Sequence, residues 1–216
     1  MKTRMITFED GLRLVHAQME GVRSVAIGVM TGAGSGNETP ENNGISHFIE
    51  HMYFKGTKTR SSYDIVKQID ALGAQINAYT AKQATCFYTI CVDDESEKCA
   101  EILSDILFDS TFDPEEMERE KKVVLEEISM CDDDYADVCA DTASKLYFGS
   151  DPLGMPILGT RGNVKRFTRD DLLGYIGKNY NVGSTVISIA GNISFEKAEE
   201  IVRKYSVRAV IIAIPS

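Results

Sequence analysis

The alternation of apolar and polar positions along the chain predicts two β-hairpins. Ile6–Phe8 and Leu12–Ala17 alternate on either side of residues 9–11, whose Asp-Gly pair is a strong signal for a tight turn. Ala74–Thr80 and Thr85–Val92 alternate in the same way and carry the aromatic and β-branched side chains that favour strands. We therefore expect these four segments to form two pairs of antiparallel strands.

Three longer apolar runs predict more deeply buried chain. Val22–Met30 and Ser184–Ile193 are typical of buried strands. The third run, Val207–Pro215, fits either one more strand of the sheet or an exposed surface that associates with a partner.

Helical periodicity and clear capping signals predict helices between these strands. The first extends from about Asn43, its candidate N-cap, to Lys55, and Gly56 ends it. Asp113 and Pro114 begin a new helix inside a long helical block, because they supply a cap and a proline at the first position. The predicted helical ranges are 43–55, 62–72, 94–149, 168–180 and 195–205, with Ser61 or Ser62, Thr168 and Ser194 as the caps of the second and of the last two.

The order of these elements favours an α+β fold. Strands and helices are mixed without strict β-α alternation, which argues against a doubly wound parallel sheet. Residues 31–44 and 151–163 are loops by composition, because Gly, Asn and Pro are frequent in them. No low-complexity segment or linker divides the chain, so we expect a single domain over residues 1–216.

Composition excludes several classes of protein. The 216 residues carry a net charge of −10, and 43% of them are hydrophobic, which is typical of a globular chain. We expect no nucleic-acid binding, because the sequence has no basic stripe to contact phosphates. We also expect no membrane insertion, because no apolar run approaches the about 20 residues that a spanning helix needs.

The N-terminus and the cysteines predict a cytoplasmic protein. The first residues alternate polar and apolar without the apolar stretch of a secretory signal. The odd number of cysteines and the lack of a CxxC pair favour free thiols in a reducing compartment. The five are Cys86, Cys91, Cys99, Cys131 and Cys139.

Acidic residues are concentrated in one part of the chain. Residues 93–141 carry a net charge of −15, whereas the rest of the chain is net positive. A solvated acidic helix surface explains this concentration. A field that attracts cationic peptides or a metal cation is the alternative interpretation.

Two of the three histidines lie in the segment HFIEH, residues 47–51. On a helix, His47 and His51 share one face and can reach a single metal ion, at the about 2.0–2.1 Å that zinc–nitrogen bonds require. Glu50 lies beside them on the helical wheel, where its carboxylate can take a proton from a water molecule at the ion. A chance pair is the alternative, but the intervening glutamate and the preceding glycine-rich loop favour a metal site. His16, the remaining histidine, is interpreted as a plain strand residue.

A hydrolytic zinc site usually takes three ligands from the protein, and the third must come from a distant segment. The candidates Glu120, Glu126 and Glu127 all lie in one predicted helix. Glu120 and Glu127 share an apolar stripe and point inward, which is costly unless they bind or pair with something. Glu126 falls on a wet stripe with Lys122 and Arg119, where an ion pair explains it. We prefer Glu127 as the ligand and Glu120 as its support, although the wheel alone does not rank these two.

HFIEH is the inverted HxxEH zinc motif, and the chain resembles the N-terminal half of an insulinase or pitrilysin-type metallopeptidase. It is most similar to the bacterial relatives of the mitochondrial processing peptidase. The resemblance extends from Gly11 to about Tyr205 and includes GNETPENNGISHFIEHMYFKGT, GAQINAYTAKQATCFY, KKVVLEEISM, PLGMPILGT and STVISIAGNI. It implies a mixed, largely antiparallel sheet with helices packed on one face.

The resemblance implies a zinc-dependent metalloendopeptidase with a role for each candidate residue. His47, His51 and Glu127 are its implied ligands for one zinc ion per chain. Glu50 is the implied general base, and Glu120 is the supporting glutamate seven residues before the ligand.

The resemblance also implies an extended peptide as substrate. In this family the peptide adds a strand to an exposed sheet edge, which points to the backbone of Asn77, Ala78 and Tyr79. An edge strand offers unpaired backbone groups to any extended chain, so the physical basis is sound. An asparagine at a bend in the strand is the alternative interpretation.

Full-length relatives have a second, similarly folded half that closes over the first. The residues after Tyr205 do not supply it, so we expect a partner, either a second copy of this chain or a separate chain of similar fold. Two other hypotheses are a non-catalytic peptide-binding or assembly subunit and a structural zinc domain. The intact motif argues against the first, and the lack of a cysteine near HFIEH argues against the second.

Overall fold

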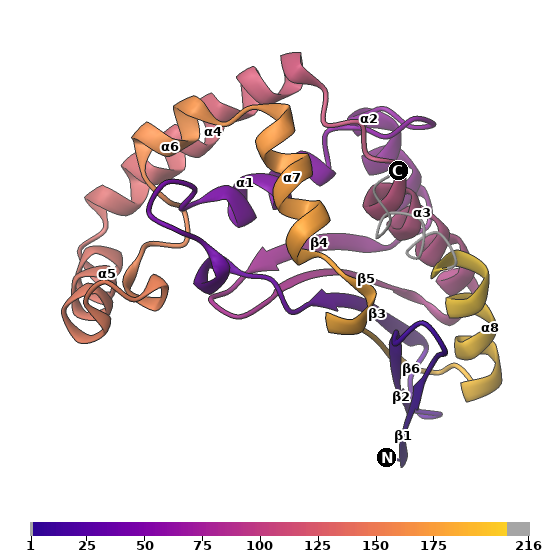
Figure 1. The fold of residues 1–216 in the computed structure, drawn as a ribbon. Helices are drawn as coiled ribbons and strands as arrows, with labels where there is room; N and C mark the ends of the chain where they lie inside the picture. The colour runs from indigo at the N-terminus through magenta and orange to yellow at the C-terminus, as the bar shows by residue number, and fades with distance from the viewer. Residues whose placement is uncertain (1, 207–216) are drawn as a thin grey trace.

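The computed structural model describes residues 2–206. They form six strands and eight α-helices (Figure 1). In chain order the elements are β1 (Lys2–Thr7), β2 (Arg13–Gln18), β3 (Ser24–Thr31), α1 (Ile45–Tyr53), α2 (Ser62–Ala71), β4 (Gln75–Thr80), β5 (Thr85–Val92), α3 (Ser96–Asp109), α4 (Pro114–Asp133), α5 (Tyr135–Phe148), α6 (Arg161–Arg166), α7 (Arg169–Asn179), β6 (Thr185–Gly191) and α8 (Phe195–Ser206).

The strands form one mixed sheet in the order β1-β2-β6-β3-β5-β4. Neighbouring strands are antiparallel except β2 and β6, which are parallel, with His16 beside Ile189. Both predicted hairpins are confirmed, as β1–β2 and β4–β5. The expected mixed and largely antiparallel sheet is confirmed as well.

The helices lie on one side of this sheet, and some of them pack on other helices and not on the strands (Figure 1). Side-chain alternation along β3 marks the two faces, because Val25 and Ile27 are buried whereas Ser24 and Met30 are exposed. α1 and α2 pack beside β4, and α3 and α8 cover β5, β3 and β2. The α+β class, with helices on one side of the sheet, is therefore confirmed.

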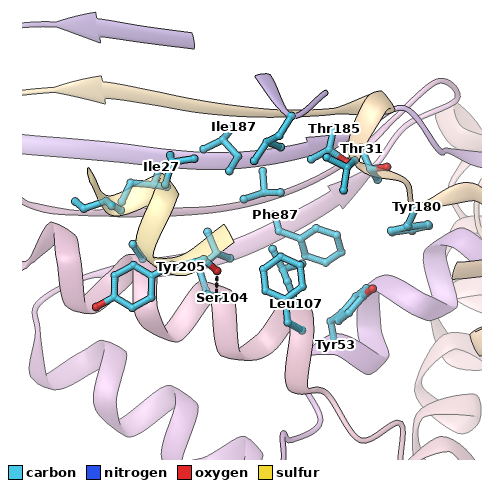
Figure 2. Close-up of a pocket in the computed structure, with 18 of the residues that line it drawn as sticks. Ile27, Thr31, Tyr53, Phe87, Ser104, Leu107, Tyr180, Thr185, Ile187 and Tyr205 are labelled. Atoms are coloured by element: carbon cyan, nitrogen blue, oxygen red, sulfur yellow. Dashed lines mark hydrogen bonds between the residues drawn. The ribbon is translucent and has the colours of Figure 1, made fainter. Parts of the chain in front are cut away.

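A cavity of about 100 Å³ lies between the sheet and the helices α3 and α8 (Figure 2). Apolar side chains, among them Ile27 and Phe87, form most of its wall. Among residues 2–206, Thr31 Oγ1 and Tyr180 Oη, which also line it, have no hydrogen-bond partner. The described part of the core is therefore incompletely filled at this point.

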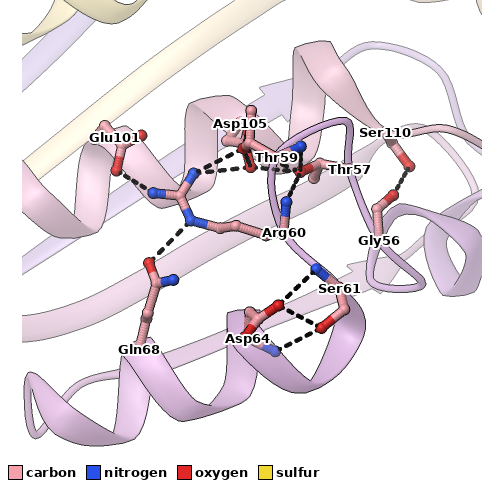
Figure 3. A network of polar contacts seen from close by, with 10 residues as sticks. All are labelled: Gly56, Thr57, Thr59, Arg60, Ser61, Asp64, Gln68, Glu101, Asp105 and Ser110. Carbon is pink, nitrogen blue, oxygen red and sulfur yellow. Dashed lines mark hydrogen bonds and ion pairs between the residues drawn. The ribbon is translucent and has the colours of Figure 1, made fainter.

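A polar network ties the segment after α1 to α3 (Figure 3). Asp105 is 4% exposed, accepts hydrogen bonds from Thr57 at 2.7 Å and Thr59 at 3.0 Å, and pairs with Arg60 at 2.9 Å. Arg60 also pairs with Glu101 at 2.7 Å. Burial would raise the pKa of Asp105, but these hydrogen bonds hold it below its ordinary value. The chain that leaves α1 is thus fixed against α3.

Most of the predicted helix starts are confirmed. Ser61, Asp113 and Thr168 each accept a hydrogen bond from a backbone N–H group in the first turn of the helix that follows. Ser194 Oγ accepts the N–H of Lys197 in the same way.

Two details of the predicted elements are wrong. Asn43 does not cap α1, because the cap position is Gly44 and the Asn43 side chain donates a hydrogen bond to Glu38 instead. Residues 151–163, expected to be loop, contain the start of the short helix α6, which Thr160 caps. Six residues are too few for a helical period to stand out from a Gly- and Pro-rich segment.

Other expectations have simpler outcomes. His16 is a buried residue of β2 whose Nε2 lies 2.9 Å from the carbonyl oxygen of Ile193, in keeping with a structural role. No helix within residues 2–206 combines the length and the apolar content needed to cross a membrane. The run Val207–Pro215 lies outside the described residues.

Candidate metal centre

A buried glutamate organises the start of α1, the helix that carries three candidate residues. Gly44 occupies the cap position with a left-handed φ of 97°, and a Cβ there would lie 2.6 Å from the carbonyl oxygen of Leu158. Glu38, only 2% exposed, accepts hydrogen bonds from the N–H groups of Gly44 and Ser46 at 2.8 and 2.9 Å. Burial raises the pKa of Glu38. Its carboxylate satisfies N–H groups that a helix start leaves without partners.

His47, His51 and Glu127 converge where α1 packs against α4. The two histidines lie one turn apart on α1, and their Nε2 atoms are 3.2 Å apart. Glu127 Oε2, from α4, lies 3.8 Å from His47 Nε2 and 3.5 Å from His51 Nε2. Among residues 2–206, they form the one group of His, Cys, Asp or Glu side chains with three ligand atoms within 4.8 Å of one another.

These separations fit a tetrahedral metal ion. Ligand atoms that lie about 2.0–2.1 Å from a tetrahedral zinc ion are about 3.3 Å from each other, close to the three separations here. Glu127 Oε2 is buried and makes no hydrogen bond within the described part of the chain, which is costly for a carboxylate oxygen. A zinc ion between the three side chains would supply the missing partner, and imidazole nitrogen and carboxylate oxygen are donors that zinc accepts.

Glu120 holds His51 by a hydrogen bond to Nδ1, the ring nitrogen that faces away from His47 and Glu127. Glu120 is 4% exposed; its Oε1 lies 2.7 Å from His51 Nδ1, and its Oε2 lies 2.6 Å from Lys55 Nζ. Burial would raise the pKa of Glu120, but the hydrogen bonds from His51 and Lys55 hold it below its ordinary value. Since an ionised carboxylate only accepts, His51 Nδ1 carries a proton, and in neutral His51 the lone pair is on Nε2. This arrangement is typical of metal-binding histidines.

The two histidines have different proton affinities. Burial, reinforced by the nearby His51, lowers the pKa of His47 to about 4, so His47 is neutral at pH 7. Burial acts on His51 in the same direction, but Glu120 and Glu127 outweigh it and raise the pKa of His51. A metal ion therefore competes with a proton mainly at His51.

Glu50 lies on α1 beside the histidines and is half-buried. Burial raises the pKa of its carboxyl group, and a hydrogen bond from Thr80 opposes that shift. Thr80 Oγ1, at the end of β4, donates this bond to Glu50 Oε2 at 2.5 Å. A carboxylate whose pKa is raised is suited to general acid–base chemistry near neutral pH.

Glu126, the third candidate on α4, is exposed. Its outward position agrees with the helical wheel, but the prediction of an ion pair with Lys122 or Arg119 is wrong. Within the described residues Glu126 forms no ion pair with Lys122 or Arg119, and Arg119 pairs with Glu115 and Glu116. These two acids lie four and three residues before Arg119, a helical spacing that brings the side chains together on one face.

The three residues expected to contact substrate lie on the edge strand β4. Among the described strands, β4 pairs only with β5, and it packs against α1. Asn77 is exposed, Tyr79 is 47% exposed and Ala78 is half-buried. The N–H of Ala78 donates to Asn77 Oδ1 at 2.8 Å, so an exposed side chain satisfies it. The unpaired edge of β4 thus lies next to α1, the helix that carries His47, Glu50 and His51.

Sequence reasoning missed three residues that shape this site. Lys55 lies four positions after His51, a helical spacing that could have pointed to it. Glu38 and Thr80 reach α1 from a loop and from a strand. Only the tertiary structure brings these two side chains to the helix, and no local pattern marks them.

Comparison with known proteins places the chain in a family. The sequence profile described as insulinase (peptidase family M16) matches residues 13–161, a range that contains all the candidate site residues. The chain belongs to the M16 peptidase family. Among M16 relatives, the zinc protease YmxG of Bacillus subtilis is 47% identical over 188 residues. The mitochondrial-processing peptidase subunit beta of Saccharomyces cerevisiae is 36% identical over 203 residues. The resemblance carried by HFIEH and its flanking segments is confirmed.

The chain spans less than half the length of these M16 relatives. The match covers 87% of this chain and 46% of YmxG. For the yeast subunit it covers 94% of this chain and 44% of the relative. The likeness therefore concerns one half of each relative.

Solved structures of bacterial proteins share the fold. A protease from Helicobacter pylori has a TM-score of 0.89 at 21% identity, covering 94% of this chain and 50% of that protein. An M16 inactive domain from Pseudomonas fluorescens also reaches 0.89, at 17% identity, covering 96% of this chain and 51% of that protein. At such identities the likeness shows the fold alone. Because the second domain is described as inactive, the M16 fold by itself does not establish catalysis.

Proposed function

We propose that this chain is the zinc-binding half of a metalloendopeptidase that hydrolyses peptide bonds in extended peptides. The observation that carries the proposal is the meeting of His47, His51 and Glu127 at separations that suit one zinc ion, with Glu50 beside them. The names of two relatives, a zinc protease and a processing peptidase, support the same chemistry.

The proposed reaction divides the work between the metal and Glu50. When bound, zinc supplies a Lewis acid that polarises the scissile carbonyl and lowers the pKa of a water molecule. Glu50 accepts a proton from the attacking water and then donates it to the nitrogen of the leaving amine. The water oxygen ends in the new carboxyl group as the C–N bond breaks. The raised pKa of Glu50, caused by burial, suits both proton transfers.

The proposed substrate is a peptide in extended conformation. It pairs with the backbone of β4 at Asn77, Ala78 and Tyr79, where the strand has no described neighbour on its outer side. Main-chain hydrogen bonds to a sheet edge hold a peptide without demanding a particular sequence. This places the peptide backbone alongside α1, which carries the base.

The setting of the reaction is also part of the proposal. We propose that a second half of similar fold, in a second copy or in a separate chain, covers the site. Closure of this kind orients the peptide and excludes water. We further propose that the protein acts in the cytoplasm, because all five cysteines are free thiols.

The test compares the wild-type chain with Glu50→Gln, using metal analysis and a quenched unstructured peptide on the same samples. Glutamine keeps the size of glutamate but cannot take up the proton. We expect zinc to stay at about one per chain and turnover to fall by roughly 10²–10⁴-fold. Unchanged turnover would remove Glu50 from the mechanism. Zinc and peptide binding without any turnover in the wild type would favour the non-catalytic subunit instead.

A further inference from the structure

We propose that Thr80 is a positioning residue for Glu50, and that it couples the peptide-binding edge strand to the base. The proposal rests on the proposed function, because it assigns Glu50 the role of base. Thr80 itself lies outside the HFIEH motif and is not among the candidate metal ligands. One hydroxyl group joins the last residue of β4 to the middle of α1.

The contact divides the two carboxylate oxygens of Glu50 between different tasks. Thr80 Oγ1 donates to Oε2 at 2.5 Å, and a threonine hydroxyl has a single proton to donate. Oε2 is therefore engaged, and this bond restrains the orientation of the carboxylate. Oε1 has no such tie to β4 and is the oxygen that we assign to the proton transfer. A base held in one orientation gains the benefit of preorganised geometry.

Thr80 is itself held in place. It is the last residue of β4 and is paired in register with Thr85, the first residue of β5. Thr85 is fully buried, and its Oγ1 donates to the carbonyl oxygen of Ala33 at 2.9 Å. The Thr80 hydroxyl thus belongs to a strand end that is hydrogen-bonded, through Thr85, to the glycine-rich loop between β3 and α1.

The turn after Thr80 is clamped by the same loop. Ser35 N donates to the carbonyl oxygen of Ala81 at 3.0 Å, and Gly36 N donates to that of Lys82 at 2.6 Å. At Gly34 a Cβ would lie 2.3 Å from the carbonyl oxygen of Ala81, so only glycine permits this approach. The glycine-rich loop therefore fixes the end of the substrate strand, and through Thr80 it fixes Glu50.

The strand alternation connects this contact to peptide binding. Ala78 and Thr80 are half-buried on the helix side of β4, while Asn77 and Tyr79 are exposed. A peptide paired with residues 77–79 therefore binds within three positions of the hydroxyl that orients the base. The strand that binds the peptide is thus the strand whose last residue orients the base, so peptide binding and proton transfer are linked through the Thr80 side chain.

The test uses the full chain with Thr80→Val, which removes the hydroxyl at nearly constant shape, and Thr80→Ser, which keeps it. We expect Thr80→Val to keep its zinc and a KM within about twofold of wild type, while kcat falls by about tenfold, as for loss of a hydrogen bond to a charged group. Thr80→Ser should keep most of the wild-type kcat. Thr89→Val is the matched control, because Thr89 is buried and donates to the carbonyl oxygen of Gln75 instead; it should lower stability without a specific loss of kcat.

Two results would overturn the role of Thr80: an unchanged kcat in Thr80→Val, or equal losses in the valine and serine variants. Unfolding experiments give a readout that does not depend on turnover. We expect Thr80→Val to change the unfolding equilibrium constant about tenfold less in a Glu50→Ala background than in the wild type. Additive effects would contradict the contact even if the chain hydrolyses nothing. If the unfolding data show coupling between Thr80 and Glu50 but the wild type hydrolyses no peptide, the contact exists. Its role in positioning a catalytic base is then overturned, and the result also counts against the proposed function.

Discussion

Two glutamates on one face of α4 show how neighbouring residues of the same kind acquire different tasks. Both oxygens of Glu120 are engaged, one by His51 and one by Lys55. Glu127, two turns later, has one buried oxygen without a hydrogen bond among the described residues. The partners around each carboxylate, and not its position on the helical wheel, distinguish support from ligand.

Replacement of Glu127 is the direct test of this difference. Loss of a hydrogen-bond partner of a metal ligand typically lowers metal affinity by roughly 10–100-fold. We expect Glu127→Gln to lower zinc affinity by more than this, because the variant loses a charged ligand. Competition with a chromogenic chelator measures the affinity. Glu126→Gln removes the same charge one residue away on the exposed face and should change affinity little. If Glu126→Gln releases the metal and Glu127→Gln retains it, the assignment on α4 is wrong.

The candidate residues on α1 could be predicted from sequence because the information is local. His47, Glu50 and His51 lie within five positions, and a helix alone places them together. Lys55 and Glu120 are far apart along the chain, and Glu120 meets Lys55 and His51 only through the packing of α1 on α4. The helical pattern limited the candidates for the third ligand to the inward-facing Glu120 and Glu127. The family resemblance then favoured Glu127.

At the scale of elements, α1 is held at both ends by buried carboxylates. Glu38 binds the N–H groups at its start, and Asp105 fixes the segment that follows it. Hairpins and caps could be predicted because their signals lie within a few residues. The parallel pairing of β2 with β6 could not be predicted, since it joins segments about 170 residues apart. The predicted cap at Asn43 was wrong because Glu38, from the preceding loop, accepts the N–H groups at the start of α1.

Asp105 gives a prediction for stability and its pH dependence. Asp105→Asn should lower the free energy of unfolding at pH 7 by roughly 1–3 kcal/mol, because it leaves buried donors poorly matched. The pKa of Asp105 in the folded protein is held below its ordinary value, which is about 3.9. The contribution of its charge is therefore complete above about pH 4 and is lost as the pH falls through the lower folded-state value.

Urea unfolding of both proteins between pH 7 and pH 3 measures this effect. The difference between wild type and Asp105→Asn should narrow below about pH 4. Asp94→Asn is the matched control, since Asp94 forms an exposed ion pair with Arg23 and should contribute at most about 1 kcal/mol. A difference for Asp105 that grows on acidification would contradict the assigned direction of its pKa.

In the molecule as a whole, no described helix covers the second face of the sheet (Figure 1). The sheet face opposite the helices exposes apolar side chains, including Met30, Ile90 and Val92, which are 40–43% exposed. The candidate site and the edge of β4 lie at one end of the same sheet. The matched region is less than half of each of the two M16 relatives, in keeping with the proposed second half that covers the candidate site.

We therefore expect the isolated chain to bind zinc and extended peptides but to cleave slowly. Efficient cleavage should need association with a second copy or with another chain of similar fold, because closure supplies orientation and water exclusion. A sizing column with a peptide assay on each fraction measures both properties together. A strictly monomeric peak with a turnover near the typical enzyme value of about 10 per second would contradict this expectation.

X-ray absorption at the zinc K edge of the loaded chain shows whether His47, His51 and Glu127 form a zinc site. The geometry predicts a shell of nitrogen and oxygen neighbours at about 2.0–2.1 Å, with the outer-shell scattering of two imidazole rings and no sulfur at about 2.3 Å. In a His47→Ala, His51→Ala double variant, this spectrum should be lost. A shell dominated by sulfur, or an unchanged spectrum in the double variant, would show that zinc binds elsewhere and that these three residues do not form its site.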